Sequence, residues 1–237
     1  MKDNIRKNLK KRKDHLIEKA LKLIETGVLI NNPESIEIRG DLVCEGNITI
    51  DNNCVFEGKV TLSDGVKIGF NCFIRDAVIG SGTVIEPFSI VDGSKIGANS
   101  RIGPYGRLRP NSVIESSVQI GNFVEIKSSS IGSNSRINHH SFIGDTDMKE
   151  GVTVGAGVIT CNHDGQNINK TLINKNSYIG SNCSLIAPLN IGEKSIIGAG
   201  SVITKDTAPN KLTLARSDQK IIENWNGPIS FTDNPKK

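Results

Sequence analysis

Two cations, Arg109 and Lys127, lie eighteen residues apart inside a stretch with a six-residue repeat. If three hexads make one coil of a solenoid, these residues stack on neighbouring strands, roughly 4.8 Å apart. Directly opposed like charges destabilise a sheet, and a bound anion would remove the conflict. The spacing therefore favours an anion site, for which phosphate is the natural ligand. Two solvated side chains that splay apart are the alternative.

His139 and His140 follow Ile137 where the coil is expected to turn, so both imidazoles are expected outside the core. His139 falls in one column with Asn122, and Glu125 lies one coil below. A carboxylate there could orient the imidazole and raise its basicity, as in general-base sites. This pattern indicates catalysis by His139 with Glu125 as its partner, and an exposed histidine without a role is the alternative.

A metal centre is the other chemistry that these histidines could supply. His139, His140 and His163 lie in the repeat region, and His15 lies far from them in the N-terminal segment. Adjacent histidine side chains diverge, and the third would come from a flexible loop. A zinc site with three histidine ligands is therefore not expected.

The elements that must position these residues are built from an aliphatic residue every six positions, usually followed by Gly. This period fits neither the 3.6 of a helix nor the alternation of an amphipathic strand. It is typical of an all-β hexapeptide parallel β-helix. The aliphatic positions are Ile68, Ile74, Ile79, Ile85, Val91, Ile96, Ile102, Leu108, Ile114, Ile120, Ile126, Ile131, Ile137, Ile143, Val154, Ile179, Leu185, Ile191, Ile197 and Ile203.

Two further positions of the hexad are explained by the scaffold. The fourth residue after the aliphatic one is small and points inward, so Cys72 and Cys183 are expected in the core and not as nucleophiles. The third is often Asn, which tolerates the left-handed backbone that a corner requires. These residues are Asn71, Asn99, Asn111, Asn134 and Asn182.

Composition shifts divide the chain into three segments. Residues 1–35 are expected to be a helix over 4–26, ended by Gly27, and a linker. The apolar stripe of this helix is expected at Ile17, Ala20, Leu21 and Ile24, which follow the spacing i, i+3, i+4 and i+7. Residues 36–206 are expected to form the β-helix, with a protruding loop at 161–173 that breaks the repeat. Residues 207–237 are expected to be a C-terminal arm with a short helix over 217–226.

Charge and cysteine usage limit the possible partners. The net charge is +4, and residues 1–19 alone contribute +5, so the remainder is close to neutral and does not suit nucleic acid. The basic run is expected to be a solvated helix face, with a basic arm as the alternative. No signal peptide or membrane span is found, and the five cysteines lack CxxC spacing. A reduced, cytoplasmic setting without a membrane partner is expected.

Four stretches carry a specific resemblance, over about residues 14–228. They are Gly103-Pro104-Tyr105-Gly106-Arg107-Leu108-Arg109-Pro110, Gly121-Asn122-Phe123-Val124-Glu125-Ile126-Lys127, Gly155 to Gly165, and Ile197 to Ser201. The chain resembles the acetyltransferase half of the bifunctional glucosamine-1-phosphate N-acetyltransferase/N-acetylglucosamine-1-phosphate uridyltransferase. The resemblance implies a left-handed parallel β-helix, a homotrimer with active sites between subunits, and acetyl-CoA as co-substrate, without a metal.

Matching positions imply individual roles. His139 is implied as the general base with Glu125, and Arg109 and Lys127 as sugar-phosphate anchors. The implied acceptor-binding set is Arg109, Lys127, Phe142, Thr153, Asn162 and His163, and the implied acetyl-CoA set is Ala156, Ser181, Ala199 and Arg216. No stretch resembles the Gly-rich nucleotide-binding start of the uridyltransferase half, so uridyl transfer is not expected.

The chain departs from the family at four acceptor positions. Phe142 and His163 stand where the family has Tyr, Thr153 where it has Asn, and Ile168 where it has a loop Lys. Acetyl transfer to glucosamine 1-phosphate remains the leading hypothesis. An acyltransferase for a different amino sugar, a non-catalytic trimeric scaffold and a metal-dependent β-helix enzyme are the alternatives.

Overall fold

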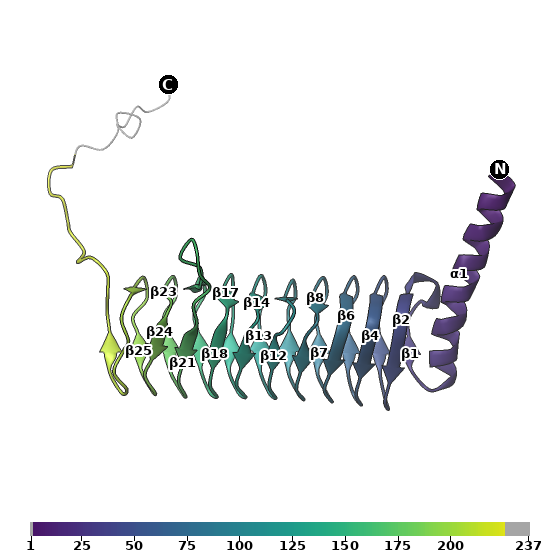
Figure 1. Cartoon of the computed structure of the whole chain (residues 1–237), viewed down its shortest axis with the longest axis horizontal. Coiled ribbons are helices and arrows are strands. Elements are labelled where there is room, and N and C mark those ends of the chain that lie inside the picture. The colour runs from purple at the N-terminus through teal and green to yellow at the C-terminus, as the bar shows by residue number, and fades with distance from the viewer. Residues whose placement is uncertain (1, 226–237) are drawn as a thin grey trace, which may run out of the picture.

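The structure, a computed structural model, describes residues 2–225. A straight solenoid makes up most of the molecule, with a helix at its N-terminal end and an extended arm at its C-terminal end (Figure 1). The helix is α1 (Lys2–Glu25), and a single 3-10 turn, η1 (Pro33–Ser35), follows within the first coil. The parallel β-helix predicted from the hexads is confirmed.

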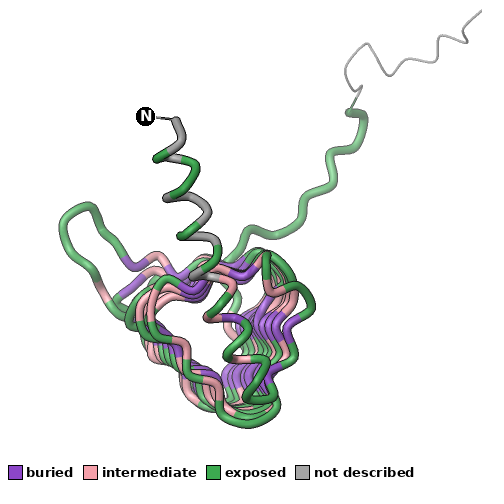
Figure 2. Tube along the Cα trace, turned by 90° about the vertical axis from the view of Figure 1, so that its right-hand side faces the viewer, coloured by how far each residue is buried: buried purple, intermediate pink, exposed green. Residues whose placement is uncertain are grey.

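The solenoid has three faces that enclose a triangular core (Figure 2). The strands pair in parallel with those of the coils on either side. The first face is β1 (Leu29–Ile30), β3 (Thr49–Ile50), β5 (Lys67–Ile68), β7 (Val84–Ile85), β10 (Arg101–Ile102), β13 (Gln119–Ile120), β16 (Arg136–Ile137), β19 (Thr153–Val154), β22 (Tyr178–Ile179), β25 (Ile196–Ile197) and β27 (Leu212–Thr213).

The other two faces share one sheet, because three long strands bend across the corner between them. These strands are β2 (Glu37–Cys44), β4 (Val55–Leu62) and β6 (Phe73–Ile79). The second face continues with β8 (Ile90–Asp92), β11 (Arg107–Leu108), β14 (Glu125–Lys127), β17 (Phe142–Gly144), β20 (Ile159–Cys161), β23 (Ser184–Ile186) and β26 (Val202–Ile203). The third continues with β9 (Lys95–Ile96), β12 (Val113–Ile114), β15 (Ser130–Ile131), β18 (Thr146–Met148), β21 (Thr171–Ile173) and β24 (Leu189–Ile191).

The core is filled as the hexads predict. Cys72 and Cys183 are each 1% exposed, so both are core residues. The inward-pointing serines are small and hydrogen-bond to the backbone of the next coil. Ser141, for example, donates to the carbonyl of Gly155 at 3.3 Å. The five corner asparagines all adopt the left-handed region, with φ between 56° and 64°. Repetition of these positions fixes the spacing of every outward side chain.

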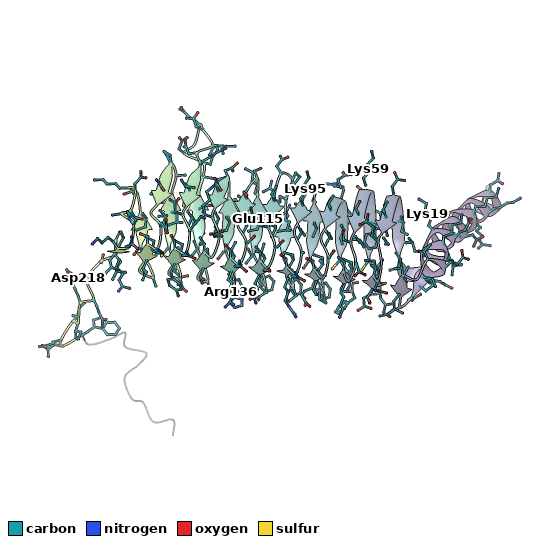
Figure 3. The ribbon with its side chains drawn as sticks, turned by 90° about the horizontal axis from the view of Figure 1, so that it is seen from below. Lys19, Lys59, Lys95, Glu115, Arg136 and Asp218 are labelled. Atoms are coloured by element: carbon teal, nitrogen blue, oxygen red, sulfur yellow. The ribbon has the colours of Figure 1, made fainter. Side chains whose placement is uncertain are left out.

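Among the described side chains of α1, those of its last turns contact the solenoid. Ala20 is fully buried, and Leu23 packs against the core. The expected apolar stripe is only partly correct, because Leu21 is 45% and Ile24 38% exposed. Lys19, labelled in Figure 3, donates to the carbonyls of Ile38 at 3.4 Å and Gly40 at 3.3 Å on the outermost strand, β2. The contact area is small because the helix covers one end of the coil and not a face.

The coil extends beyond the boundaries drawn from the sequence. β1 lies in the segment assigned to a linker, and β27 lies in the segment assigned to the arm, yet both pair with neighbouring strands. The expected helix over 217–226 is wrong for residues 217–225, which form no helix, and residue 226 lies outside the described residues. So short a segment gains little from helix formation without packing, and Ile221 and Ile222 are 83% and 74% exposed. Within residues 2–225, no helix is both long and apolar enough to cross a membrane.

Candidate active site

One corner of the prism, where the first face turns into the second, collects a predicted catalytic residue and three predicted acetyl-CoA residues. Successive backbone hydrogen bonds between coils define the column: Gly157 N to His139 O at 3.1 Å, Asn182 N to Ala156 O at 2.8 Å, and Gly200 N to Ser181 O at 2.8 Å. The column therefore runs His139, Ala156, Ser181 and Ala199 on consecutive coils. We call it the His139 corner.

The arm after the last coil begins beside the top of this column. The Arg216 guanidinium donates through Nη1 to the Ala199 carbonyl at 3.0 Å. Its side chain is exposed, so its positive charge stands in solvent at the upper end of the corner. The structure thus brings all four predicted acetyl-CoA residues to one edge of the solenoid.

Asn122, and not Glu125, is the polar partner of the His139 ring. The Asn122 side-chain oxygen contacts His139 Nδ1 in a very short hydrogen bond, and the imidazole is otherwise exposed. Glu125 directs both carboxylate oxygens toward arginines instead, at 2.9 Å from Arg109 Nη1 and 3.6 Å from Arg107 Nη1. The expected Glu125–His139 pairing is therefore corrected, because two cations on the coil below attract the carboxylate more strongly than a neutral ring does.

A column of charged residues runs along the second face and ends at the predicted anion site. Arg39, Glu57, Arg75 and Asp92 occupy matching positions on successive strands. Their charges alternate, and ion pairs join neighbours, the shortest of them between Arg75 Nη2 and Asp92 Oδ2 at 2.5 Å. Hydrogen bonds from Arg75 hold the pKa of Asp92 below its usual range. Arg109 continues the alternation on the next coil.

The alternation breaks above Arg109, where Lys127 places a second cation in the same column. The expected juxtaposition is therefore present, but each cation contacts a carboxylate: Arg109 contacts Glu125, which Arg107 shares, and Lys127 contacts Asp145, with Nζ to Oδ2 at 3.3 Å. Carboxylates of this chain therefore already relieve the conflict between the two stacked cations, which corrects part of the sequence argument. The site still offers two cationic groups side by side on one outward face.

Asp145 links Lys127 to the base of the protruding loop. The same Oδ2 atom accepts a hydrogen bond from Asn162 Nδ2 at 2.6 Å. Asn162 is 9% exposed, and a methyl group added at Gly144 would lie 2.9 Å from its Nδ2 atom and 2.7 Å from the Phe142 ring. Phe142, Gly144 and Asn162 therefore form a packed surface directly above Lys127.

The loop between β20 and β21 projects from the corner where the second face turns into the third (Figure 2). His163 and Ile168 form an antiparallel bridge across it. The Asp164 carboxylate holds the turn by accepting hydrogen bonds from Asn167 N at 2.7 Å and Gln166 N at 2.9 Å, which lower its pKa. Ile168 is 58% exposed, so an apolar side chain stands at this outer rim.

Thr153 is not gathered with the other predicted acceptor residues. It lies on β19 of the first face, in register with Arg136, whereas Phe142 and Lys127 lie on the second face. Adjacent faces of a triangular prism point in different directions. One copy of the chain therefore divides the predicted acceptor site between two faces on either side of the His139 corner.

Sequence reasoning placed Asn122 in the column of His139 but not as its hydrogen-bond partner, and it missed two further residues that hold the site. Asn122 precedes His139 by seventeen residues and Asp145 follows Lys127 by eighteen, so the repeat alone could have paired them. Arg107 shares Glu125 with Arg109. No cluster of three or more His, Cys, Asp or Glu residues suited to a metal ion occurs within the described part of the chain.

This chain is similar in sequence to known proteins. The bifunctional protein GlmU of Nitrosospira multiformis is 47% identical over 210 residues, which are 89% of this chain. GlmU of an Azoarcus species is 46% identical over the same share. The chain is homologous to the acetyltransferase half of GlmU. This chain spans about half the length of these relatives, 46% in each case. The match alone therefore does not assign to it the activities of the whole GlmU protein.

Other comparisons match parts of the solenoid. The family described as the GMPPB C-terminal domain matches residues 38–114. Among solved structures, LpxA of Acinetobacter baumannii is 18% identical with a TM-score of 0.43, over 79% of this chain and 71% of LpxA.

Proposed function

We propose that this chain is an acetyl-CoA-dependent N-acetyltransferase for an amino-sugar phosphate, with glucosamine 1-phosphate as the favoured acceptor. The observation that carries the proposal is the His139 corner. An exposed imidazole with a fixed Nδ1 partner stands directly below three small residues whose column the GlmU resemblance assigns to acetyl-CoA. The proposal places the chain in the pathway to UDP-N-acetylglucosamine, in the cytoplasm.

The corner above His139 suits a long, thin, anionic co-substrate. The small side chains of Ala156, Ser181 and Ala199 leave open space along this corner. A methyl group added at Gly200 would meet nothing within 4 Å. Arg216 supplies a positive charge at its upper end, which suits the phosphates of coenzyme A. When bound, acetyl-CoA supplies an activated acetyl thioester.

His139 then acts as the general base. Its Nε2 atom takes a proton from the acceptor amine as the amine attacks the thioester carbonyl and the C–N bond forms. The C–S bond then breaks, and coenzyme A leaves as the thiol after the proton returns from Nε2 to its sulfur. The Ser181 hydroxyl, one coil further up the column than Ala156, is the group we assign to stabilising the developing oxyanion. Arg109 and Lys127 hold the acceptor phosphate on the second face and so orient the amine.

The division of acceptor residues between two faces supports a homotrimer as the active species. Thr153 on the first face of one copy can join Phe142 and Lys127 on the second face of another copy, whereas it cannot do so within one prism. A monomer with full activity in sedimentation and kinetic measurements would contradict this part of the proposal.

A second candidate, an N-acyltransferase for a different amino sugar, is favoured by the apolar character of the acceptor side. The Phe142 ring packs above Lys127 without a hydroxyl, and Ile168 stands exposed at the loop rim without a charge. An acceptor with fewer hydrogen-bonding groups, or without the phosphate, fits these two side chains better.

The test is thiol release from acetyl-CoA with glucosamine 1-phosphate, for the wild type, His139→Ala and the control His140→Asn. His140 occupies the same corner but stacks on Phe123 with ring centroids 5.0 Å apart, and Asn tolerates its left-handed φ of 49°. We expect His139→Ala to lose roughly 10²–10⁴-fold in rate and His140→Asn to retain most of the activity.

The other outcomes separate the alternatives. Turnover only with other amino sugars in a panel would favour the second candidate. Acetyl-CoA binding without turnover on any amino sugar would leave a non-catalytic scaffold. Incorporation of UTP into a sugar nucleotide would contradict the proposed absence of uridyltransferase activity in this chain.

A further inference from the structure

We propose that Asn122 is a positioning residue for His139, which fixes the tautomer and the orientation of the imidazole through the Nδ1 contact. The inference rests on the proposed role of His139 as the general base. An amide oxygen can only accept a hydrogen bond, so Nδ1 must carry the proton when it bonds to Asn122 Oδ1. The lone pair of the neutral ring is then on Nε2, the atom that faces away from Asn122.

Backbone hydrogen bonds between the two coils hold this pair in register. His140 N donates to the Asn122 carbonyl at 3.1 Å, which locks the two coils in register at the corner. The next residues of the two coils, Phe123 and His140, both adopt left-handed φ values, 57° and 49°, and their rings stack. Asn122 and His139 therefore project from two anchored corners, one directly above the other.

The lower part of the column shows that the amide is a specific feature of this coil. Below Asn122, the same corner position is occupied by Pro104 and Pro87, whose side chains offer no hydrogen-bonding group. Among the described coils below the histidine, an amide occupies this position directly below it, at Asn122, and again only at the N-terminal end of the solenoid, at Asn52 and Asn32.

The neutral partner determines how the site responds to pH. On the second face, Glu125 of the coil below is paired with Arg107 and Arg109, and on the first face Arg136 of β16 precedes His139 by three residues. His140, on the same corner, stacks on Phe123. A carboxylate in place of the Asn122 amide would be directed at the imidazole and would stabilise the protonated ring.

Two variants test the inference through the pH profile of kcat/KM for thiol release. Asn122→Ala removes the acceptor, and we expect a loss on the order of ten-fold, smaller than for His139→Ala. Asn122→Asp keeps an acceptor at the same place, so most of the rate should return at high pH. Its acidic limb should move to higher pH by about one unit or more, because the carboxylate favours the protonated ring.

The matched controls are Asn52→Ala and Asn52→Asp. Asn52 stands at the same position of the hexad, two residues after the buried Ile50 as Asn122 is two after Ile120, but it lies far from His139 along the solenoid. These controls should leave both the rate and the pH profile unchanged. A rate loss equal to that of the Asn122 variants would mean that any corner amide acts through coil stability, and would overturn the proposal.

A spectroscopic measurement separates failure of this inference from failure of the proposed function. Protein labelled with ¹⁵N-histidine carries only four histidines, and the His139 signals are identified by their loss in His139→Ala. The neutral His139 ring should carry its proton on Nδ1 in the wild type and lose that preference in Asn122→Ala. If the preference is absent in the wild type, or unchanged by Asn122→Ala, the inference is wrong, whether or not the protein transfers acetyl groups.

Discussion

Replacement of Asp145 tests the connection between the cation pair and the loop. Its Oδ2 atom accepts from Lys127 Nζ at 3.3 Å and from Asn162 Nδ2 at 2.6 Å, and its backbone has a left-handed φ of 48°. Asp145→Ala leaves a half-buried cation without its partner and a buried amide without its acceptor. Hydrogen bonds to charged groups contribute about 1.5–3 kcal/mol each, and Ala lacks the short polar side chain that helps Asp to tolerate the left-handed region.

The expected destabilisation by Asp145→Ala is therefore about 3–5 kcal/mol, after allowance for partial exposure of the Lys127 ammonium. Asp145→Asn keeps the acceptor and tolerates the left-handed backbone, so it should cost about 1–2 kcal/mol. Urea unfolding of all three proteins gives the free energies, and hydrogen exchange at residues 162–170 shows whether the loss is local. The loop amides should exchange faster in Asp145→Ala, while those of β5 and β7 stay unchanged.

Kinetics supply the second readout of the same variants. Asp145→Ala frees the Lys127 side chain and the loop base, so KM for the sugar phosphate should rise while KM for acetyl-CoA, bound at the His139 corner, stays near the wild-type value. Equal stability of Asp145→Ala and the wild type would refute the reasoning, because it would mean that the Lys127–Asp145–Asn162 contacts are not formed in solution.

Three further predictions concern the scaffold. Arg75 lowers the pKa of Asp92, so the stability from this pair is present at neutral pH and lost as the pH falls below about 4; melting temperatures of Asp92→Asn should therefore depend less on pH in that range. A methyl group at Gly121 would lie 1.7 Å from a backbone oxygen of the next coil, so Gly121→Ala should lower the free energy of unfolding by about 1–3 kcal/mol or more, and an unchanged urea midpoint would contradict this. Burial raises the pKa of the Cys72 thiol to about 12, so alkylation of the native protein at pH 8, read by mass spectrometry, should modify the half-exposed Cys161 well before it.

The repeat predicted the positions of backbone elements far better than the partners of side chains. The hexads placed Arg109 beside Lys127 and His139 above Asn122, because a constant coil length fixes which residues are neighbours. They did not predict that Glu125 turns to the arginines. The ion-pair partner of Glu125 depends on competition between several charged groups, each within reach of two or three others. It also depends on side-chain rotamers, which the six-residue repeat does not specify.

Ends and corners were also harder to predict than the faces. The faces consist of repeated strands, so the assignment of one strand is constrained by those of its neighbours. In contrast, α1 and the arm have no repeat and each contacts the coil at one place. The buried face of α1 was assigned from helical spacing alone, although, among its described side chains, those of its last turns touch the solenoid. The division of acceptor residues between two faces likewise follows from the triangular cross-section, which the linear pattern does not reveal.

The Lys19 contact on the outermost strand has a consequence for how these molecules behave in a crowded solution. A solenoid can in principle grow without limit, because each coil is a template for the next, and β2 pairs only with β4 among the described strands. Lys19 covers two carbonyls on the unpaired side of β2, where a charged side chain discourages another strand from adding. We therefore expect this end of the solenoid to resist the addition of a coil from another molecule at β2.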